Sequence, residues 1–303
     1  MPLQKLSLDD NLGNNTSHLF KSGNVLRRDE ELDDLVRVRK MLPKFGPRRT
    51  RIEYDVWYDM NDKRRIHGYT YTDVMQKFVM LRVCSNHHSL EHIKSCIEAR
   101  HLTDEGIAVY EDIANDSQDK YRLKKAHEQY DNVIFLPGGN VYGTIVDEDK
   151  VAKAIKEEGA MLKLHPITPK TMASMLGYKF GRQNLIDKKI SGNTLLQSCK
   201  KVYTCYNSEM GLVGMIKGKE FGFIGKDTNE PSTYKHIYDA LLNQWEIGEL
   251  GEDDSIEMRF KWLFSAPNNG LISIKYGNPQ EKINNFFKHW KDWPHVPPKN
   301  IDT

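Results

Sequence analysis

The sequence has few cysteines and no long apolar run. Its four cysteines, Cys84, Cys96, Cys199 and Cys205, are scattered through 303 residues and form no CxxC pair. They are too few to staple a chain of this length, so we expect reduced thiols. No stretch approaches the roughly 18 consecutive apolar residues of a membrane span, and the N-terminus lacks the apolar core of a signal peptide. We therefore expect a cytoplasmic protein with no membrane partner.

The chain also lacks an excess of either charge. Its formal net charge is only +2, so the protein as a whole does not attract nucleic acid strongly. Residues 37–51 are an exception, with seven basic side chains and no acidic one. Such a run can neutralise phosphates, and Arg48, Arg49 and Arg51 are the candidate nucleic-acid contacts. A solvated helix end followed by a proline-containing loop is the structural alternative.

Short apolar stretches alternate with helical patterns from Lys77 onward. The composition, 39% apolar and 28% charged, is that of a folded globular protein. The predicted strands are KFVMLRV (77–83), GIAVY (106–110), NVIFL (132–136), AMLKL (160–164), KVYTCY (201–206) and EFGFI (220–224). Helices of about ten residues between strands favour an α/β fold with a parallel sheet.

Polar or glycine residues follow three of these strands. Ligands of open α/β sheets bind outside the carboxyl ends of the strands. Glycines let backbone amides approach a phosphate, and a hydroxyl at a helix start adds to an anion site. Taken singly, each feature also fits an ordinary turn or helix cap. The candidates are Gly138, Gly139, Asn140, Lys163, His165, Asn207 and Ser208.

Together these positions resemble part of a known enzyme family. The pattern is K-x-H-P, then a strand, S-x-x-G, and G-K before a final strand. It resembles the C-terminal half of GT-B glycosyltransferases and is closest to the capsule-polysaccharide and Kdo-transferase-like group. The resemblance covers a minor part of the chain, and its motifs are short. The matching residues are Lys163, His165, Pro166, Ser208, Gly211, Gly218 and Lys219.

The resemblance implies a nucleotide-sugar donor whose phosphates face His165 and Ser208, with no cofactor or metal. Lys219 would help to neutralise the departing phosphate. The group usually has Glu-Ala two residues after the S-x-x-G glycine, where this chain has Val213 and Gly214. Glu209 is therefore the candidate substitute for the missing carboxylate.

The implied fold is α/β and GT-B-like, with two Rossmann-like lobes of which the N-terminal lobe is short or divergent. We expect an acceptor-side lobe with an irregular N-terminal arm over residues 1–130. The nucleotide-sugar-binding lobe is expected over 131–245, and a C-terminal extension over 246–303 is expected to pack back on the lobes. The oligomeric state is left open.

Transfer to a hydroxyl needs a base that takes the acceptor's proton. His87 and His88, just after KFVMLRV, and Glu111 and Asp112, just after GIAVY, are the candidate catalytic residues. Both pairs are expected at strand ends that face a cleft. Spacing alone does not choose between them.

The basic run favours a hydroxymethylated base in DNA as the acceptor, as in phage enzymes that glycosylate DNA. A phage protein of this kind would act in the host cytoplasm. A capsule-type saccharide acceptor is the alternative. A catalytically inactive module that binds nucleotide or nucleic acid is a further one.

Two motifs compete with this hypothesis. Residues 88–92 fit H-x-x-E-H, a zinc-protease pattern in which His88 and His92 would bind the metal. A polar helix start is the preferred interpretation. Asp147-Glu148-Asp149 imitates a D-x-D metal clamp, but acids also favour a helix N-terminus, and we prefer that interpretation.

Overall fold

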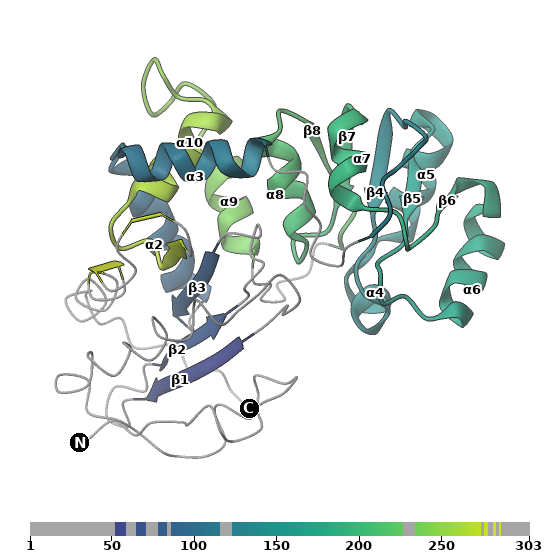
Figure 1. The fold of residues 1–303 in the computed structure, drawn as a ribbon, viewed down its shortest axis with the longest axis horizontal. Helices are drawn as coiled ribbons and strands as arrows, with labels where there is room; N and C mark the ends of the chain where they lie inside the picture. The colour runs from purple at the N-terminus through teal and green to yellow at the C-terminus, as the bar shows by residue number, and fades with distance from the viewer. Residues whose placement is uncertain are drawn as a thin grey trace. The chain divides into compact units, whose positions relative to one another are not determined.

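The chain divides into two compact units (Figure 1). The computed structural model describes residues 52–58, 65–70, 78–83, 86–115, 123–226, 234–273, 276–277, 281–282 and 285. Unit 1 comprises Met1–Val109 and Met258–Thr303, and unit 2 is Tyr110–Glu257. The unit boundaries thus lie at 109/110 and 257/258, whereas the sequence prediction places lobe boundaries at 130/131 and 245/246.

Unit 1 contains an antiparallel sheet with strand order β1-β2-β3-β9. Each strand pairs antiparallel with its neighbour. KFVMLRV is confirmed as a strand, but it belongs to this antiparallel sheet and not to a parallel β-α-β unit. A Rossmann-like lobe is therefore not confirmed among the described residues of unit 1. The strands are β1 (Ile52–Tyr58), β2 (Arg65–Thr70), β3 (Phe78–Val83) and β9 (Leu271–Ser273).

The prediction that GIAVY forms a strand is wrong, because these residues lie in helix α3 (Asp104–Asn115). Its branched and aromatic residues favour a strand, but the helix-start signals around it are stronger. The Thr103 hydroxyl accepts a hydrogen bond from the Gly106 amide (3.1 Å), and acids occupy the first turn. The apolar residues buried at helical spacing are Val109, Tyr110 and Ile113.

Helices α2 (Asn86–Glu98) and α10 (Ile256–Ser265) are the other helices described in or bordering unit 1. The Ser265 hydroxyl accepts a hydrogen bond from the Thr103 amide (3.0 Å) at the start of α3. A Cβ added at Gly106 would overlap Ser265. The first turn of α3 therefore packs directly on the end of α10.

Unit 2 contains a five-stranded sheet with order β6-β5-β4-β7-β8. All neighbouring strands are parallel, as predicted. The chain runs outward from β4 to β6, returns beside β4 at β7 and continues outward to β8. This reversal is the topology of a doubly wound sheet, with its switch point between β4 and β7. The strands are β4 (Asn132–Phe135), β5 (Met161–Lys163), β6 (Leu185–Ile186), β7 (Lys201–Thr204) and β8 (Glu220–Phe223).

Helices connect the parallel strands and cover the sheet (Figure 1). α4 and α5 lead from β4 to β5, α6 to β6, α7 to β7 and α8 to β8. Among the described residues, no helix combines the length and apolar character needed to cross a membrane. The helices are α4 (Gly139–Ile145), α5 (Glu148–Glu158), α6 (Lys170–Phe180), α7 (Gly192–Ser198), α8 (Glu209–Ile216) and α9 (Lys235–Leu242), with a short 3-10 helix at Arg182–Asn184.

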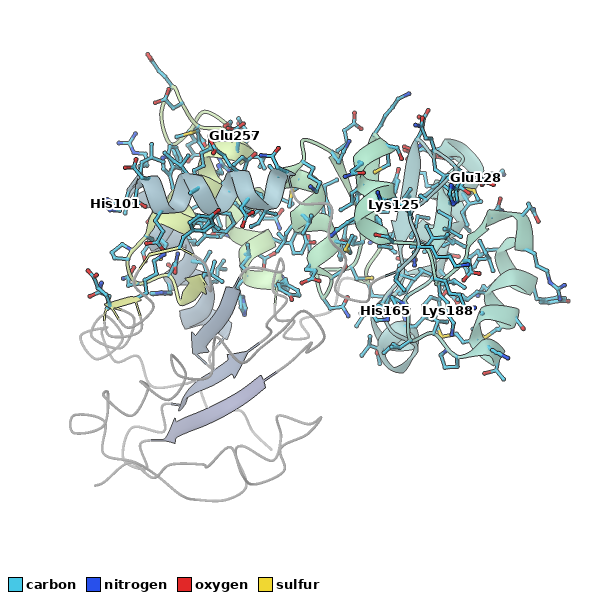
Figure 2. The ribbon with its side chains drawn as sticks, viewed as in Figure 1. His101, Lys125, Glu128, His165, Lys188 and Glu257 are labelled. Carbon is cyan, nitrogen blue, oxygen red and sulfur yellow. The ribbon has the colours of Figure 1, made fainter. Side chains whose placement is uncertain are left out.

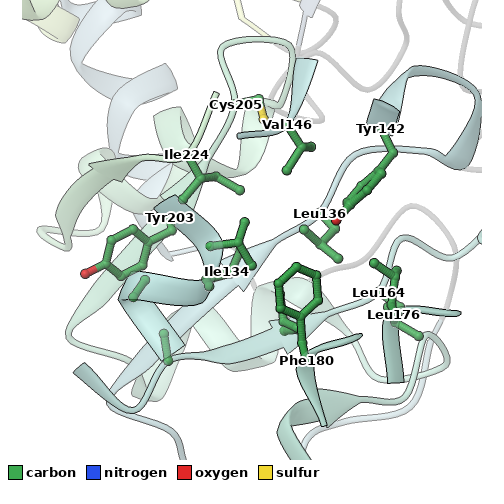
Figure 3. Close-up of a cluster of buried hydrophobic side chains, with 14 residues drawn as sticks. Ile134, Leu136, Tyr142, Val146, Leu164, Leu176, Phe180, Tyr203, Cys205 and Ile224 are labelled. Carbon is green, nitrogen blue, oxygen red and sulfur yellow. The ribbon is translucent and has the colours of Figure 1, made fainter. Parts of the chain in front are cut away.

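Alternate residues along the strands point to opposite faces of the unit 2 sheet. Tyr203 belongs to a core cluster with residues of α5 and α6, whereas its neighbour Val202 faces Gly214 of α8. Burial on both faces explains why these strands read as continuous apolar runs. Figure 3 shows the first cluster, which contains Ile134, Leu136, Tyr142, Val146, Val151, Ala154, Ala160, Leu162, Leu164, Leu176, Phe180, Tyr203, Cys205 and Ile224.

Both ends of α5 are capped. The Asp147 side chain accepts hydrogen bonds from the amides of Asp149 (3.1 Å) and Lys150 (3.2 Å). Gly159 ends the helix in the left-handed conformation, with φ 62° and ψ 28°. The D-x-D imitation is therefore a helix cap, as preferred from the sequence.

Two glycine substitutions in unit 2 should change stability in opposite directions. Gly159→Ala forces a Cβ into left-handed backbone and should lower the free energy of unfolding by about 1 kcal/mol. Gly143→Ala is the matched control, because Gly143 lies in α4 with open space around its Cβ position. It should raise the free energy of unfolding by up to about 1 kcal/mol through helix propensity. Urea denaturation measures both, and equal effects of the two substitutions would contradict these assignments.

Candidate functional site

The loops that follow β4, β5, β6 and β7 lie at one edge of the unit 2 sheet, because the strands are parallel. We call this the carboxyl edge and define it as residues 136–140, 164–169, 187–193 and 205–209. β5 and β7 flank β4, and neighbouring strands lie about 4.8 Å apart. The structure thus brings most of the sequence-predicted donor-binding residues to one edge, around the switch point.

The loop after β4 is held close to the loop after β5. Gly138 is the N-cap of α4, and Gly139 begins the helix. A Cβ added at Gly139 would lie 2.7 Å from Met172 Sδ and 3.2 Å from Pro169 Cδ. A side chain here would crowd Met172 and Pro169, so the second glycine has a role in packing. Asn140 is the next residue of α4, and its side chain lies outside the described residues.

Lys163 and His165 occupy the end of β5. Lys163 is 3% exposed, and its ammonium donates to the carbonyls of Leu164 (2.6 Å) and Lys188 (3.3 Å). It places a buried positive charge between the loops after β5 and β6. The His165 Nδ1 accepts a hydrogen bond from the Ile167 amide (3.3 Å), so in the neutral ring the proton lies on Nε2. Figure 2 shows His165 and Lys188 at the same end of unit 2.

The start of α8 supplies the third part of the edge. The Ser208 hydroxyl caps the helix by accepting from the Met210 amide (3.2 Å), and the buried Glu209 begins the first turn. The amide oxygen of Asn207 is buried and accepts no hydrogen bond from the described residues. A ligand group that donates a hydrogen bond, such as a sugar hydroxyl, would satisfy this oxygen.

A fourth segment, at the start of α7, was missed by the sequence prediction. Ser191 is the N-cap, and its side chain accepts from the Thr194 amide. A Cβ added at Gly192 would lie 2.9 Å from Met210 Cε and 3.1 Å from Phe135 Cε1. The α7 start therefore sits against the end of β4 and the start of α8. The serine at position 191 was the available sequence signal, because serine is a common N-cap. The strand before it, β6, has only two residues, so the sequence showed no strand pattern that would place Ser191 at a strand end.

Helix starts and one buried ammonium gather at the carboxyl edge. Helices α4, α6, α7 and α8 begin there, and the first turns of α4, α6 and α7 carry no acidic residue, whereas α8 carries Glu209. Residues 160–208 have a net charge of +7, but Lys200 and Lys201 of this stretch lie at the opposite edge, where they pair with Asp131 and Glu158. Helix N-termini and the buried Lys163 both favour an anion at this edge.

Several predicted residues are not brought to this edge. Lys219 precedes β8, so it lies at the opposite edge, where its ammonium donates to the Gln197 carbonyl (3.4 Å). Glu111 and Asp112 were expected at the end of a strand, but they lie within helix α3. His87 and His88 follow β3 in the first turn of α2, and their side chains lie outside the described residues. Arg48, Arg49 and Arg51 lie entirely outside the described residues.

Two residues of the H-x-x-E-H motif, Glu91 and His92, contact other parts of the protein in ways that stabilise the fold. His92 is buried, and its Nε2 lies 2.7 Å from the Asn268 carbonyl. Glu91 pairs with Lys94 (3.3 Å). Burial raises the pKa of the nearby Cys96 thiol to about 12, so it stays protonated at neutral pH. Among the described residues, no three potential ligands are placed to hold a metal.

The S-x-x-G spacing has a packing reason. A Cβ added at Gly211 would overlap the Tyr238 hydroxyl and lie 2.7 Å from Thr204 Oγ1. Tyr238 is fully buried, and its hydroxyl donates to the Ser208 carbonyl (2.7 Å). Burial raises the pKa of Tyr238, which keeps this donor protonated. Because residue 211 is a glycine, the Tyr238 side chain can pack against α8 and hydrogen-bond to Ser208, the residue that caps this helix.

No protein-family model and no curated protein matches the chain. Two similar solved structures are KpsC transferases of Thermosulfurimonas dismutans. The beta Kdo 2,7 transferase has TM-score 0.35 and 13% identity and covers 74% of this chain and 71% of its own. The beta Kdo 2,4 transferase has TM-score 0.37 and 16% identity, with 74% and 73% covered.

Gly211→Ala should lower the free energy of unfolding by about 1–3 kcal/mol through overpacking. The cost should be smaller in a Tyr238→Phe background, because that change removes the hydroxyl that the new methyl group meets. Urea unfolding of the four proteins in this double-mutant cycle measures the coupling. An unchanged cost in the Phe background would contradict the contact.

Proposed function

We propose that the chain is a glycosyltransferase that binds a nucleotide-sugar at the carboxyl edge of unit 2 and transfers the sugar to an acceptor hydroxyl. The observation that carries this proposal is the switch point between β4 and β7, where ligands of doubly wound sheets bind. Gly139 and Ser208 start helices on either side of it, and His165 follows the adjacent strand. Of these residues, the sequence resemblance assigns His165 and Ser208 to the donor phosphates.

The donor phosphates would accept hydrogen bonds from the amides at the start of α8 and from His165 Nε2. In the reaction the acceptor hydroxyl attacks the anomeric carbon, and the bond from that carbon to the phosphate oxygen breaks. The departing nucleotide takes the electron pair, so negative charge grows at the phosphate. The helix N-termini and the buried Lys163 ammonium stabilise that charge before and during transfer. Lys219 has no part in this step, because it lies at the other edge.

The acceptor proton needs a base, and four candidates remain. His87 and His88 follow strand β3 and lie at the start of α2. Glu111 is exposed on α3, and Asp112 is its half-buried neighbour. Each would have to come within hydrogen-bond reach of the acceptor hydroxyl. The proposal leaves this role to be assigned by mutation.

The acceptor class and the cellular location stay hypotheses from the sequence. A hydroxymethylated base in phage DNA rests on the basic run at residues 37–51, which lies outside the described residues. The structure adds no support for that acceptor, and a saccharide acceptor is equally compatible with the donor site. A cytoplasmic location is part of the same proposal.

Nucleotide binding should stabilise the protein and depend on His165. In a thermal-shift screen with UDP, GDP, CMP, ADP and dTDP, one nucleotide should raise the melting temperature. At about 100 times its Kd the ligand adds about 2.7 kcal/mol to the free energy of unfolding. His165→Ala should remove most of that shift. His101→Ala, at an exposed histidine of unit 1, is the matched control and should keep it. No shift with any of the five nucleotides would contradict the donor site.

Turnover separates an enzyme from a binding module. With the matching nucleotide-sugar and acceptor, His165→Ala should lower kcat by about 10²–10³, the usual effect of removing one donor to a developing charge. Release of free nucleotide, followed with time, measures the rate. A wild-type protein that binds the nucleotide but never releases it from its sugar would support the module instead.

A further inference from the structure

Two buried tyrosines hold the two ends of helix α8 in unit 2. The Tyr238 hydroxyl, from α9, donates a hydrogen bond to the carbonyl of Ser208 at the N-terminal end (2.7 Å). The Tyr110 hydroxyl, from α3, donates to the carbonyl of Ile216 at the C-terminal end (3.0 Å). Burial raises the pKa of both hydroxyls, so both stay protonated donors at neutral pH. The two bonds have the same chemistry, but only the bond from Tyr238 lies at the carboxyl edge.

The Tyr238 ring is held on several sides, so its hydroxyl has a defined position. The ring stacks on Phe221 of β8 and is tilted against Tyr206, in the loop after β7, with ring centroids 5.2 Å apart in both pairs. The hydroxyl also lies 3.4 Å from the Thr204 hydroxyl. Aromatic contacts of this kind have preferred geometries, and the Tyr238 side chain is fully buried. It therefore offers a rigid donor to the start of α8, which α9 lies beside (Figure 1).

The hydrogen bond to Ser208 also orients the next amide of the chain. A peptide group is planar and trans, so its carbonyl and its N–H point in opposite directions. The Ser208 carbonyl shares a peptide group with the N–H of Glu209, the residue that begins α8. A hydroxyl that holds this carbonyl therefore directs the Glu209 N–H away from Tyr238, toward the N-terminal side of the helix. The first N–H groups of a helix have no carbonyl partner within the helix and can bind an anion.

We propose that Tyr238 is a positioning residue of the donor site, whose hydroxyl holds the Ser208–Glu209 peptide group in the orientation that binds the donor phosphate. This inference rests on the proposed function, because that proposal places the phosphate at the start of α8. Tyr238 acts through Ser208, since its own side chain is fully buried. Tyr110 makes the same kind of bond at the other end of α8 and has no such role.

Two matched substitutions in the full chain test the proposal. Tyr238→Phe and Tyr110→Phe each remove one hydroxyl and the hydrogen bond that it donates to a carbonyl of α8. Both should lower the melting temperature, because each leaves a carbonyl without this donor. Nucleotide affinity should separate them. In titration calorimetry with UDP, GDP, CMP, ADP and dTDP, Tyr238→Phe should raise the Kd of the nucleotide that binds about tenfold, and Tyr110→Phe should change it less than about twofold.

Thr204→Val provides a second test that leaves Tyr238 in place. It removes the other hydroxyl near the Tyr238 oxygen while keeping the shape of a buried side chain. This variant should raise the Kd of the same nucleotide about threefold, because the Tyr238 hydroxyl is then held less firmly. Should Tyr238→Phe fail to fold, the Kd of Thr204→Val decides in its place, and an unchanged value overturns the proposal.

The outcomes distinguish this inference from the proposed function. A wild type that binds a nucleotide, together with a folded Tyr238→Phe that binds it equally well, would overturn the role of Tyr238 and leave the donor site standing. An equal loss of affinity in Tyr110→Phe would also overturn it, because the effect would then belong to the stability of α8 as a whole. A wild type that binds none of the five nucleotides would overturn the donor site and this role together.

Discussion

The parallel alignment of five short strands is the constraint on which the rest of unit 2 depends. Parallel pairing places every residue that follows a strand at one edge, and the reversal between β4 and β7 makes a switch point there, the place where ligands of doubly wound sheets bind. The two central strands, β4 and β7, have only four residues each, and three of the four are buried in both strands. The same constraint excludes Lys219 from the carboxyl edge. Lys219 precedes β8, so no local rearrangement brings it to the edge where His165 lies.

Close backbone approach explains why glycine recurs around that edge. Gly139 leaves room for Pro169 and Met172, Gly192 for Phe135 and Met210, and Gly211 for the Tyr238 hydroxyl. Each glycine thus holds two loops or a helix and a strand at contact distance. A glycine in a short sequence motif is easily attributed to phosphate binding. At Gly211 packing alone requires a glycine, and at Gly139 and Gly192 an added Cβ would first meet the end of a methionine side chain. The functional argument therefore rests on the helix starts and on the buried ammonium of Lys163, not on the glycines.

The sequence predicts local structure where capping and periodicity agree, and fails where partners are distant or signals conflict. Asp147 begins α5, as the acids at residues 147–149 predict, and Gly159 ends it in left-handed backbone. GIAVY is helical because the cap at Thr103 outweighs β-propensity. β3 pairs with β9, almost two hundred residues later, a contact that no local pattern reveals. The residues at the strand ends of unit 2 could be predicted from the sequence. The position of Lys219 could have been predicted as well, because the direction of β8 alone places it at the edge opposite the carboxyl edge.

The positive charge of residues 160–208 is divided between ion pairs and the carboxyl edge. These residues supply strands β5 to β7 and carry +7, although the whole chain carries only +2. Acids from outside this stretch pair with part of that charge: Glu148 with Lys179, Asp131 with Lys200 and Glu158 with Lys201. The ion pairs of Lys200 and Lys201 lie at the start of β7, away from the carboxyl edge. The buried Lys163 and three acid-free helix starts lie at the carboxyl edge instead, where they favour an anion such as a phosphate.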